Sequence, residues 1–242
     1  MNILYIWDAD YPWDVRVEKI CTSLIKNGHS VHIASRNLKK NRIYEKSHGL
    51  HIHRLKSFKN DKINYIASFP AFFSPLWKKL LDFVIEENDI NLIIVRDLPL
   101  AIAGLWAGRR HNCKVVFDMA EDYVSMVKEI WRTRKFQNVN LVVRNPYLAK
   151  LVEKYALKRM DHVLVVVEEA VNVVIRGGGC RERVTIVGNT PPKNSLHLNK
   201  ENVVSCQKLI KSRFTAIYTG GIQMGRGIQT VFDAIPLIVG NI

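Results

Sequence analysis

The stretch ILYIWDADYPWDVRVEKICTSLIKNGHSVHIA, residues 3–34, decides the fold. Its runs Ile3–Trp7 and Ser30–Ala34 have the composition of buried β-strands. Between them, apolar residues recur at helical spacing; Asp14 is placed to cap the start of that helix, and Gly28 to end it. A helical crossover of this length joins parallel strands, so the stretch predicts a βαβ unit.

The same alternation of strands and helices continues along the chain. Further strands are predicted at Leu50–Leu55, Asn91–Val95, Lys114–Asp118, His162–Val167 and Arg183–Val187. Helices are predicted at Pro99–His111, within residues 146–159 and at Glu168–Arg176, and Asp8–Asp14 and Asp118–Tyr123 are predicted to be loops. Strands that alternate with helices in this way build a doubly wound α/β domain around a parallel sheet.

A segment with two prolines divides the chain. The sequence NTPPKN at residues 189–194 is typical of a boundary between domains. We therefore predict a Rossmann-like domain over residues 1–190. Residues 191–242 are predicted to hold a linker and the first strand–helix unit of a second, incomplete Rossmann-like domain.

The segment RFTAIYTGGIQMGRGI, residues 213–228, has the order strand, glycine turn, helix. Gly220 and Gly221 let the backbone approach a ligand closely, because glycine has no Cβ. The helix start that follows offers unpaired N–H groups, and Arg226 beside Gly227 adds a full positive charge. The combination suits a phosphate group, and a plain turn with a solvated arginine is an equal alternative.

Charged residues gather where the predicted strands end. In doubly wound sheets, ligands bind beyond the carboxyl ends of the strands. The charged residues at these ends are Asp8, Asp10, Asp14, Arg16, Asp97, Asp118, Glu121 and Asp122. For each residue taken alone, a structural role is an equal alternative, in which Asp14 merely caps a helix and Asp118 pairs with a neighbouring Lys or Arg.

The composition of the 242-residue chain restricts its partners. A formal charge of +14 predicts attraction to anionic partners. The four scattered cysteines lack a C-x-x-C motif, which favours a reducing compartment and argues against a disulfide framework or a zinc site. His51 and His53 share a predicted strand face, but no Cys or closely spaced Asp/Glu joins them, so structural or surface histidines are expected. No secretory signal precedes the first strand, and no apolar run approaches the ~20 residues that span a bilayer.

Two segments combine basic and aromatic residues. Lys128–Arg159 holds nine Lys and Arg residues against two Glu, and Phe69–Leu81 mixes aromatic residues with two lysines. Basic residues beside interfacial aromatics favour the surface of an anionic membrane. A solvated basic helix face and a core helix are the alternative. Since no nucleic-acid-binding motif is present, nucleic acid is not expected as a partner.

Four stretches of the sequence occur together in the order that is characteristic of a known family. They are DYPWDVRVEKICTSLIKNGHSVHI at residues 10–33, IIVRDLPLAIAGLWAGRRHNCKVVFDMAEDY at 93–123, VLVVVEEAVNVVIRGGGCRERVTIVGNTPP at 163–192 and IYTGGIQMGRGIQTVFDAI at 217–235. In combination they resemble the family 4 glycosyltransferases of the GT-B fold, and the resemblance covers nearly the whole chain. It implies an enzyme that moves a sugar from a nucleotide-sugar donor to an acceptor.

The resemblance also implies roles for particular residues. The N-terminal domain would hold the acceptor, with the acceptor-binding residues Asp14, Arg16, Asp97 and Asp122. The catalytic residues would be Asp118 and Glu121. The second domain would hold the donor phosphates at Gly220, Gly221, Arg226 and Gly227. The nucleotide sugar is a co-substrate, and the family implies no cofactor and no metal.

The chain departs from the family pattern at three places. In the motif G-R-x-x-x-x-K-G, Gly221 replaces the Arg, and Arg226 replaces the Lys. In the motif D-x-H-E, Ala120 replaces the His, while Asp118 and Glu121 remain. The family's C-terminal domain also continues through further strand–helix units that carry two glutamates, so the resemblance implies that this donor domain is truncated.

The resulting hypothesis is a retaining, metal-independent glycosyltransferase with a polysaccharide or lipid-linked acceptor. It places the protein in the cytoplasm, with an anionic membrane surface, the inner face of the cell membrane, as a peripheral partner. The alternative is a catalytically inactive module that binds the acceptor or a membrane.

Overall fold

The computed structural model describes residues 1–12, 14–69, 74–133, 144–190, 217–220 and 227–239. The chain divides into two compact units, Met1–Pro191 and Pro192–Ile242. The strands of the first unit are β1 (Asn2–Asp10), β2 (Ser30–Arg36), β3 (Tyr44–Ser47), β4 (Leu50–Arg54), β5 (Leu92–Arg96), β6 (Lys114–Met119), β7 (His162–Val165) and β8 (Val184–Ile186). Its described helices are α1 (Val15–Lys26), α2 (Asp61–Ala67), α3 (Pro75–Glu87), η1 (Leu98–Leu100), α4 (Ala101–Arg110), α5 (Tyr123–Thr133), α7 (Pro146–Leu157), α8 (Glu168–Arg176) and η2 (Arg181–Arg183).

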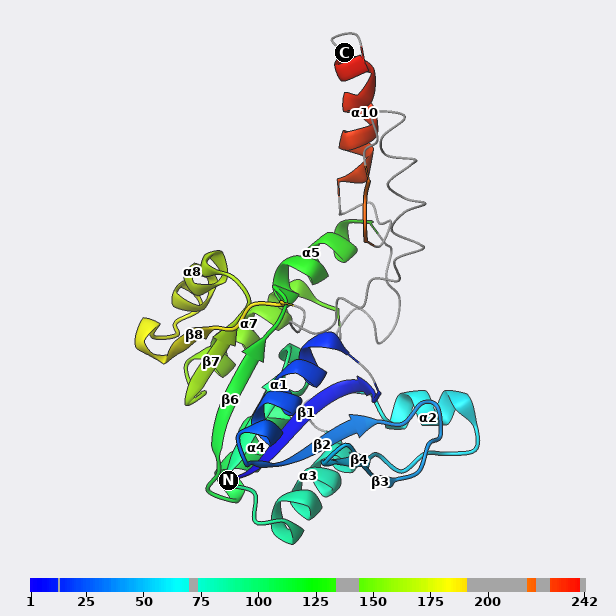
Figure 1. The fold of residues 1–242 in the computed structure, drawn as a ribbon, viewed down its shortest axis with the longest axis vertical. Coiled ribbons are helices and arrows are strands. Elements are labelled where there is room, and N and C mark those ends of the chain that lie inside the picture. Colours follow the sequence, from blue (N-terminus) through cyan, green and yellow to red (C-terminus); the bar gives the residue numbers. More distant parts are fainter. Residues whose placement is uncertain (13, 70–73, 134–143, 191–216, 221–226, 240–242) are drawn as a thin grey trace. The chain divides into compact units, whose positions relative to one another are not determined.

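The strands of the first unit form one sheet in the order β3-β4-β2-β1-β5-β6-β7-β8 (Figure 1). All neighbouring strands are parallel except β3 and β4, which pair antiparallel. The chain builds outward from β1 in one direction through β2 and β4, and then in the other through β5 to β8. This reversal is the mark of a doubly wound sheet, so the predicted fold class is confirmed.

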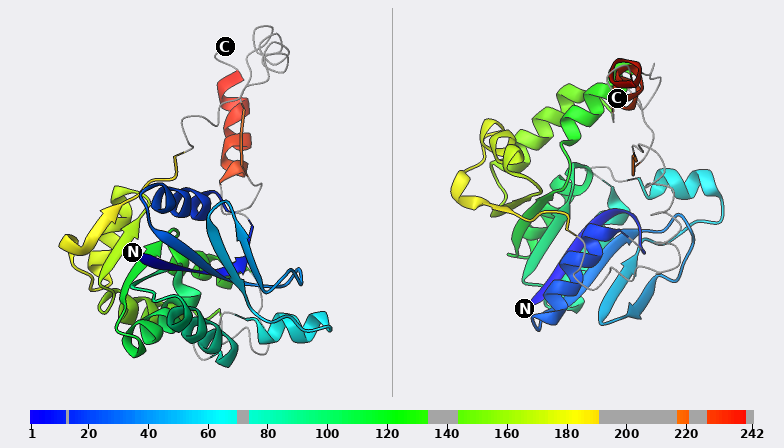
Figure 2. Two further views of the ribbon diagram at one scale, coloured as in Figure 1. Left: turned by 60° about the horizontal axis from the view of Figure 1, so that its bottom comes forward. Right: turned by 45° about the horizontal axis from the view of Figure 1, so that its top comes forward.

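Helices cover both faces of this sheet. Helix α1 packs on one face, while α3 and α4 lie on the other (Figures 1 and 2). Alternate residues of β1 therefore join different cores: Tyr5 belongs to the cluster that includes Val17 of α1, and Ile6 belongs to the cluster that includes Leu105 of α4. This alternation follows from the two-residue repeat of a strand. A sheet buried on both faces explains why its inner strands read as continuous apolar runs.

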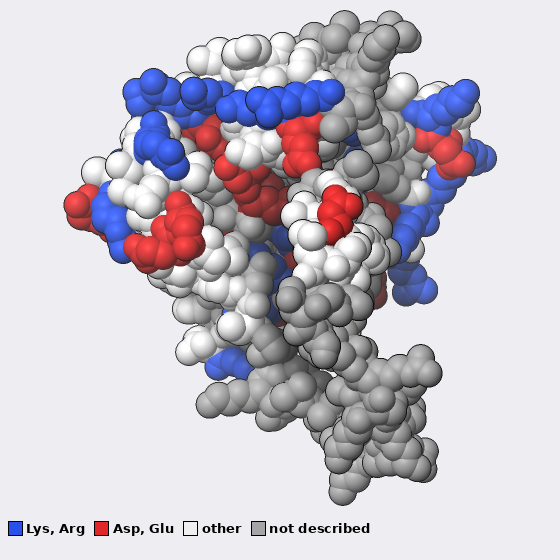
Figure 3. Space-filling model, turned by 90° about the horizontal axis from the view of Figure 1, so that it is seen from above, with Lys and Arg blue, Asp and Glu red and all other residues white. Residues whose placement is uncertain are grey.

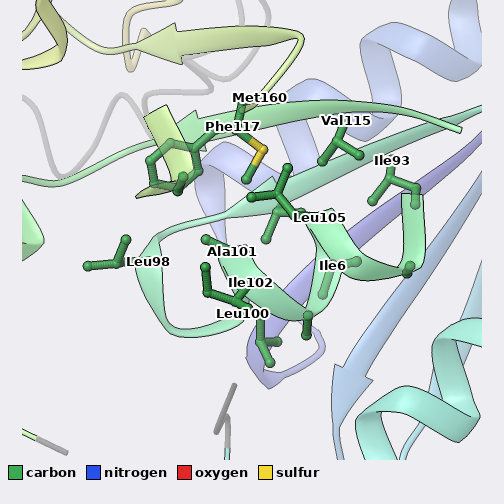
Figure 4. Packing of buried hydrophobic residues seen from close by; sticks show 14 of the residues in the cluster. Ile6, Ile93, Leu98, Leu100, Ala101, Ile102, Leu105, Val115, Phe117 and Met160 are labelled. Atoms are coloured by element: carbon green, nitrogen blue, oxygen red, sulfur yellow. The ribbon is translucent and has the colours of Figure 1, made fainter. Parts of the chain in front are cut away.

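Helix α4 packs closely on the centre of the sheet. Ala101, Ile102 and Leu105 lie among apolar side chains of β1, β5 and β6 (Figure 4). A Cβ added to Gly104 would lie 2.2 Å from Cγ2 of Val95, and one added to Gly108 would lie 2.3 Å from Cγ2 of Val115. Both glycines are thus needed for the helix backbone to approach β5 and β6, and this contact fixes the end of β5.

Helix α1 begins and ends where the sequence predicts. The Asp14 carboxylate accepts hydrogen bonds from the backbone N–H groups of Arg16 and Val17, which are otherwise unpaired at a helix start. Gly28 follows the helix with φ of +80°, a conformation that favours glycine. The predicted helix Glu168–Arg176 also has the observed bounds of α8.

Several elements differ from the prediction. Strand β1 continues through Asp10, so Asp8 and Asp10 belong to the strand rather than to a loop. The polar edge strand β3 and the helix α2 were not predicted, while α3 and α5 overlap the two segments for which a core helix and a basic helix face were the alternative. The predicted helix Pro99–His111 begins as the 3-10 turn η1, after which α4 starts at Ala101.

The described parts of the second unit are residues 217–220 and helix α10 (Ile228–Val239). Large apolar residues of this helix are exposed, with Val231 at 59% and Phe232 at 66%. No helix in the described ranges combines the length and the apolar character that crossing a membrane requires.

Candidate functional site

The reversal of strand order lies between β1 and β5. In doubly wound sheets the ligand crevice opens at the carboxyl ends of the strands at such a reversal. Here Asp8 lies near the end of β1, Asp97 directly follows β5, and Asp118 lies near the end of β6. The structure therefore brings these three predicted residues, which are far apart in the chain, to one edge of the sheet. We call this region the carboxyl edge.

Asp118 is completely buried and fully engaged. Its oxygens accept hydrogen bonds from Nε and Nη2 of Arg16 at 2.5–3.1 Å and from the hydroxyl of Tyr5 at 2.6 Å. Asp118 is 0% exposed and Arg16 is 3% exposed. The sequence left open, as an alternative, that Asp118 pairs with a Lys or Arg, and the structure shows such a pair with Arg16. In this conformation any effect of Asp118 on a ligand would be exerted through Arg16.

Arg16 also fixes the segment that follows β8. Its Nη1 donates to the backbone oxygen of Val187 at 2.6 Å and to Oδ1 of Asn189 at 2.9 Å. One turn later, Nζ of Lys19 donates to the backbone oxygen of Gly188 and to Oγ1 of Thr190. Helix α1 thus ties the last residues of the first unit to the carboxyl edge.

Asp14 and Arg96 form a second ion pair at this edge. Burial opposes ionisation of Asp14, but hydrogen bonds from Arg96 and from the N–H groups of α1 outweigh it and lower its pKa. The Arg96 guanidinium lies 5.6 Å from the ring centre of Trp7, which adds a cation–π contact. Asp14 therefore holds both the helix start and Arg96.

Asp97 occupies an unusual backbone position. Its φ is +58°, which is uncommon for a residue with a side chain and best tolerated by Asn and Asp. Its N–H donates to the backbone oxygen of Asp118, while its Oδ1 accepts from the N–H of Ala120 at 3.2 Å. Two hydrogen bonds to the loop after β6 thus hold Asp97 in this conformation.

Burial raises the pKa of Asp97 to about 7, against the nearby positive charge of Arg96. The negative charges of Asp8, Asp118 and Glu121 raise it further. Burial likewise raises the pKa of Asp8, and the charge of Glu121 adds to that shift. We call Asp8, Asp97 and Glu121 the acidic trio. These carboxylates share one electrostatic environment, and a group that titrates near neutral pH can exchange a proton under physiological conditions.

Two other acidic residues have local structural roles. Asp10 accepts hydrogen bonds from the N–H groups of Leu38 and Lys39 at 2.8 Å. Asp122 accepts from the backbone N–H and the hydroxyl of Ser125 at 2.9 and 2.7 Å, and so caps the start of α5. Asp122 lies with Glu153 in a pocket separate from the carboxyl edge.

In the space-filling view, Lys and Arg side chains form a row at one margin of the upper face (Figure 3).

The predicted donor site belongs to the second unit. Gly221 and Arg226 lie outside the described residues. Gly227 directly precedes α10 with φ of +67°, a conformation that favours glycine. Gly220 is described without a helix or strand, and a Cβ added to it would lie 2.9 Å from the hydroxyl of Tyr218.

The sequence did not single out Arg96, Tyr5 or Tyr123 as site residues. The signal for Arg96 was present, because it ends a predicted strand directly before Asp97. Tyr5 reads as a core residue, and only the fold places its hydroxyl on Asp118. Burial raises the pKa of Tyr123, and the negative charges of Asp8 and Asp97 raise it further. Within the described ranges, no group of three or more His, Cys, Asp or Glu residues is arranged to hold a metal ion.

The buried histidines are structural, as the sequence predicts. Nδ1 of His32 lies 3.1 Å from Nε2 of His53, and the rings of His32 and His51 stack at 4.5 Å. The hydroxyl of Tyr44 lies 2.9 Å from Nδ1 of His51. Burial lowers the pKa of both His32 and His53 to about 4, with the neighbouring His51 adding to each shift, so these rings are neutral at pH 7.

Comparison with protein families gives one match, to the model described as Glycosyltransferase Family 4, over residues 14–190. This range contains most of the first unit and most of the carboxyl edge. A comparison with curated protein sequences found no match.

The fold is shared with several solved structures. Sucrose-phosphate synthase from Thermosynechococcus elongatus superposes with a TM-score of 0.55 at 15% identity, over 77% of this chain and 47% of that one. HepE from Anabaena in complex with UDP-glucose gives 0.52 at 13% identity, over 87% and 50%. UDP-glucose: anthocyanidin 3-O-glucosyltransferase in complex with UDP gives 0.52 at 9% identity, over 90% and 61%. The chain thus has the GT-B type of fold and spans about half the length of the first two.

Proposed function

The chain belongs to Glycosyltransferase Family 4, and on this premise we propose that it is the acceptor-side part of a nucleotide-sugar-dependent glycosyltransferase. The proposed reaction moves a sugar from the donor to a polysaccharide or lipid-linked acceptor, with retention of anomeric configuration and without a metal. The observation that carries the proposal is the position of the acidic trio at the carboxyl edge, where this type of fold binds ligands.

The acidic trio supplies the groups that an acceptor needs. A sugar hydroxyl is both a hydrogen-bond donor and an acceptor, and a carboxylate accepts its proton. Asp97 is 18% exposed and Glu121 lies at the surface, so both can reach a ligand. Asp97 and Glu121 would accept hydrogen bonds from acceptor hydroxyls, and Arg96 would keep Asp97 oriented. Since Asp118 and Arg16 bind each other, we assign them a positioning role.

The donor phosphates are proposed to bind at the start of α10. The departing nucleotide diphosphate gains negative charge in the transition state, and positive groups placed there in advance lower the barrier. The start of a helix preceded by Gly227 offers unpaired N–H groups for this purpose. Arg226 would add the full charge, and Gly220 and Gly221 would allow a close approach of the backbone. Both UDP-bound and UDP-glucose-bound relatives of this fold motivate a UDP-sugar as the first donor to test.

The proposed location is the cytoplasm, with peripheral contact to the inner face of the membrane. Helix α7 exposes 80% of Tyr147 and 66% of Leu151, and Lys154 is exposed one turn further on. An exposed aromatic residue beside lysines suits the interface of an anionic membrane. The serine double variant Tyr147→Ser/Leu151→Ser should reduce co-sedimentation with phosphatidylglycerol vesicles, while Ile43→Ser should not. Equal sedimentation of all three proteins would remove this contact from the proposal.

Calorimetric titration of the chain with UDP-, GDP- and CMP-sugars tests the proposed donor site. One of the three should bind saturably, and Arg226→Ala should weaken binding roughly tenfold or more, since a charge-assisted hydrogen bond contributes about 1.5–3 kcal/mol. Lys62→Ala, which removes the same charge from the exposed surface of α2, should bind as the wild type does.

The second candidate function is a binding module without catalysis. The observation in its favour is that the carboxyl edge lies entirely within the first unit, so it can hold an acceptor by itself. The module would be supported, and the enzyme contradicted, by two results together. None of the three donor sugars would bind, and an acceptor glycan would bind saturably to the wild type and more weakly to Glu121→Gln.

A further inference from the structure

A separate pocket lies between α5, α7 and α8. Its cavity volume is about 370 Å³. The charged side chains that line it are Asp122, Lys128, Lys150, Glu153, Lys154 and Arg176. None of them belongs to the acidic trio or to the ion pairs of the carboxyl edge. Four cations against two carboxyl groups give this pocket an excess of positive charge.

The cations of the pocket have no ion-pair partners among the described residues. Lys128 comes from α5, Lys150 and Lys154 from α7, and Arg176 from α8, and no ion pair within 4 Å includes any of them. Arg176 donates only to the backbone oxygen of Asn172, at 3.2 Å. Three separate helices thus direct uncompensated charge to one cavity.

Neither carboxyl group of the pocket forms an ion pair with these cations in the described structure. Asp122 accepts its two hydrogen bonds from Ser125. Glu153 is only 7% exposed, and burial raises its pKa to about 7. The charge of Asp122 raises that pKa further, and those of Lys128 and Lys150 oppose the shift. Near neutral pH, Glu153 therefore carries a proton in much of the population and can donate a hydrogen bond.

The pocket is held in shape by close helix packing. A Cβ added to Gly177, at the end of α8, would lie 2.4 Å from Cδ1 of Leu157 in α7. Val124 of α5 is buried in the same region, at 6% exposed. The ends of α7 and α8 are therefore in close contact, so the cations around the cavity come from helices that are packed together. A site held by packed helices costs less to organise when a ligand binds.

We propose that this pocket binds the phosphate or pyrophosphate group of an anionic ligand, with Lys128, Lys150 and Lys154 as its cationic contacts. Phosphate oxygens accept hydrogen bonds, and three ammonium groups from two helices can surround them. Protonated Glu153 adds a donor, and its ionised form repels the ligand. Binding should therefore weaken as the solution becomes more alkaline. The site is independent of the proposed transfer reaction, because binding alone defines it.

The test is calorimetric titration of the full chain with two probes. Inorganic pyrophosphate represents a soluble ligand. Dihexanoyl phosphatidic acid, used below its micelle concentration, represents a lipid phosphate without a membrane surface. Lys128→Ala and Lys150→Ala should each weaken binding roughly tenfold or more, because each removes a charge-assisted contact. Lys79→Ala, an exposed lysine of α3 outside the pocket, is the matched control and should bind as the wild type.

Glu153→Gln separates a ligand site from a set of solvated lysines. The amide is uncharged at every pH, so this variant should bind pyrophosphate more tightly than the wild type at pH 8 and equally at pH 6. The protonation state of pyrophosphate also changes with pH. This change affects the wild type and Glu153→Gln alike, so it cancels when the two proteins are compared. Tighter binding of the lipid probe would identify a lipid phosphate as the source, and tighter binding of pyrophosphate would identify a soluble one. If neither probe binds saturably, or if the lysine variants bind like Lys79→Ala, the pocket is not a phosphate site.

Discussion

The carboxyl edge and the pocket between α5, α7 and α8 use charge in opposite ways. At the carboxyl edge, Arg16 is bound to Asp118 and Arg96 is bound to Asp14; the first pair is buried, and in the second pair Arg96 is largely buried and Asp14 is half-buried. In the pocket, Lys150 and Arg176 face a cavity without ion-pair partners in the described chain. The comparison teaches that buried charges satisfied by each other hold the fold, whereas cations left without partners are free to hold a ligand.

The cost of burying a charge explains the difference. An ion taken out of water loses hydration, and only a partner with good hydrogen bonds offsets that loss. Asp118 is 0% exposed, so its carboxylate depends on Arg16 and Tyr5 for its hydrogen bonds. The pocket lysines stay hydrated, so they need no internal partner. Each region can thus be tested by removing one charge and measuring which property responds.

The largest effect is expected from Arg16→Met. It leaves the buried Asp118 carboxylate without its guanidinium and removes the hydrogen bonds to Val187 and Asn189. Urea denaturation should show a loss of about 3–5 kcal/mol in the free energy of unfolding. The double variant Arg16→Met/Asp118→Asn should recover part of this loss, because the uncompensated charge is gone. A change below 1 kcal/mol in the single variant would contradict the assignment of this pair as structural.

The next effect concerns buried groups that have no charged partner at all. The pKa of His32 and of His53 is about 4 in the fold, below the ordinary 6.5. A lowered histidine pKa means that the stability is complete above pH 6.5 and is lost as the pH falls towards 4. For one histidine this loss is on the order of 3 kcal/mol. The protonated rings would face each other, Lys46 and the uncharged Tyr44.

Thermal unfolding between pH 7 and pH 4 measures this loss. His53→Gln keeps a polar side chain that cannot become charged, so its midpoint should fall less on acidification than that of the wild type. His29→Gln changes a histidine outside the buried cluster and should follow the wild type. Parallel curves for all three proteins would show that the cluster does not limit acid stability.

An effect of the opposite sign, a gain in stability, is expected from Asp97→Asn. The pKa of Asp97 is raised from 3.8 to about 7, so the ionised group disfavours the folded state above pH 7, and this penalty vanishes below about pH 4. The variant should therefore be more stable than the wild type by about 4 kcal/mol at pH 8 and equally stable at pH 4, because a pKa difference of about 3 units corresponds to about 1.4 kcal/mol per unit. Asn also tolerates the positive φ at this position.

Acceptor binding by Asp97→Asn gives the functional half of this test. If Asp97 receives a proton or a hydrogen bond from the acceptor, binding or turnover should fall although the stability rises. A rise in stability with unchanged activity would keep Asp97 as a structural residue and remove it from the proposed function.

The smallest effect on stability belongs to the pocket. Lys150→Ala and Arg176→Met remove charges that have no ion-pair partner in the described structure, so the free energy of unfolding should change by only about 0.5 kcal/mol or less. Urea denaturation at low and at high salt measures this change. A loss above 2 kcal/mol would mean that these cations hold the fold as Arg16 does, and the contrast between the two regions would disappear.

The sequence by itself determined the local elements and the fold class. The strand composition of Ile3–Trp7, the helical spacing before Gly28 and the cap at Asp14 are all properties of neighbouring residues, and the structure has each of them. The family resemblance and the α/β class followed from such segments in order. Helix α8 was predicted with its observed bounds because its start and its terminal glycines are local signals.

Elements with weak local signals were missed. Strand β3 (Tyr44–Ser47) is polar, lies at the edge of the sheet and has no apolar alternation, so only pairing with β4 makes it a strand. The position of Asp8 within β1 likewise depends on a pairing, in which Asp10 lies opposite Arg36 of β2. Propensity alone does not describe such edge positions, because the sheet context overrides it.

The tertiary structure alone decided which charges meet. Arg16 and Asp118 are 102 positions apart, and Arg96 and Asp14 are 82 positions apart. The order of strands in the sheet brings them together, and that order is not encoded in any one segment. Burial works in the same way, since Glu153 lies on a helix rich in lysines and only the packing of α5 and α8 around it encloses its carboxyl group. Charges interact over a few ångströms of space, and only the fold converts distance along the chain into distance in space.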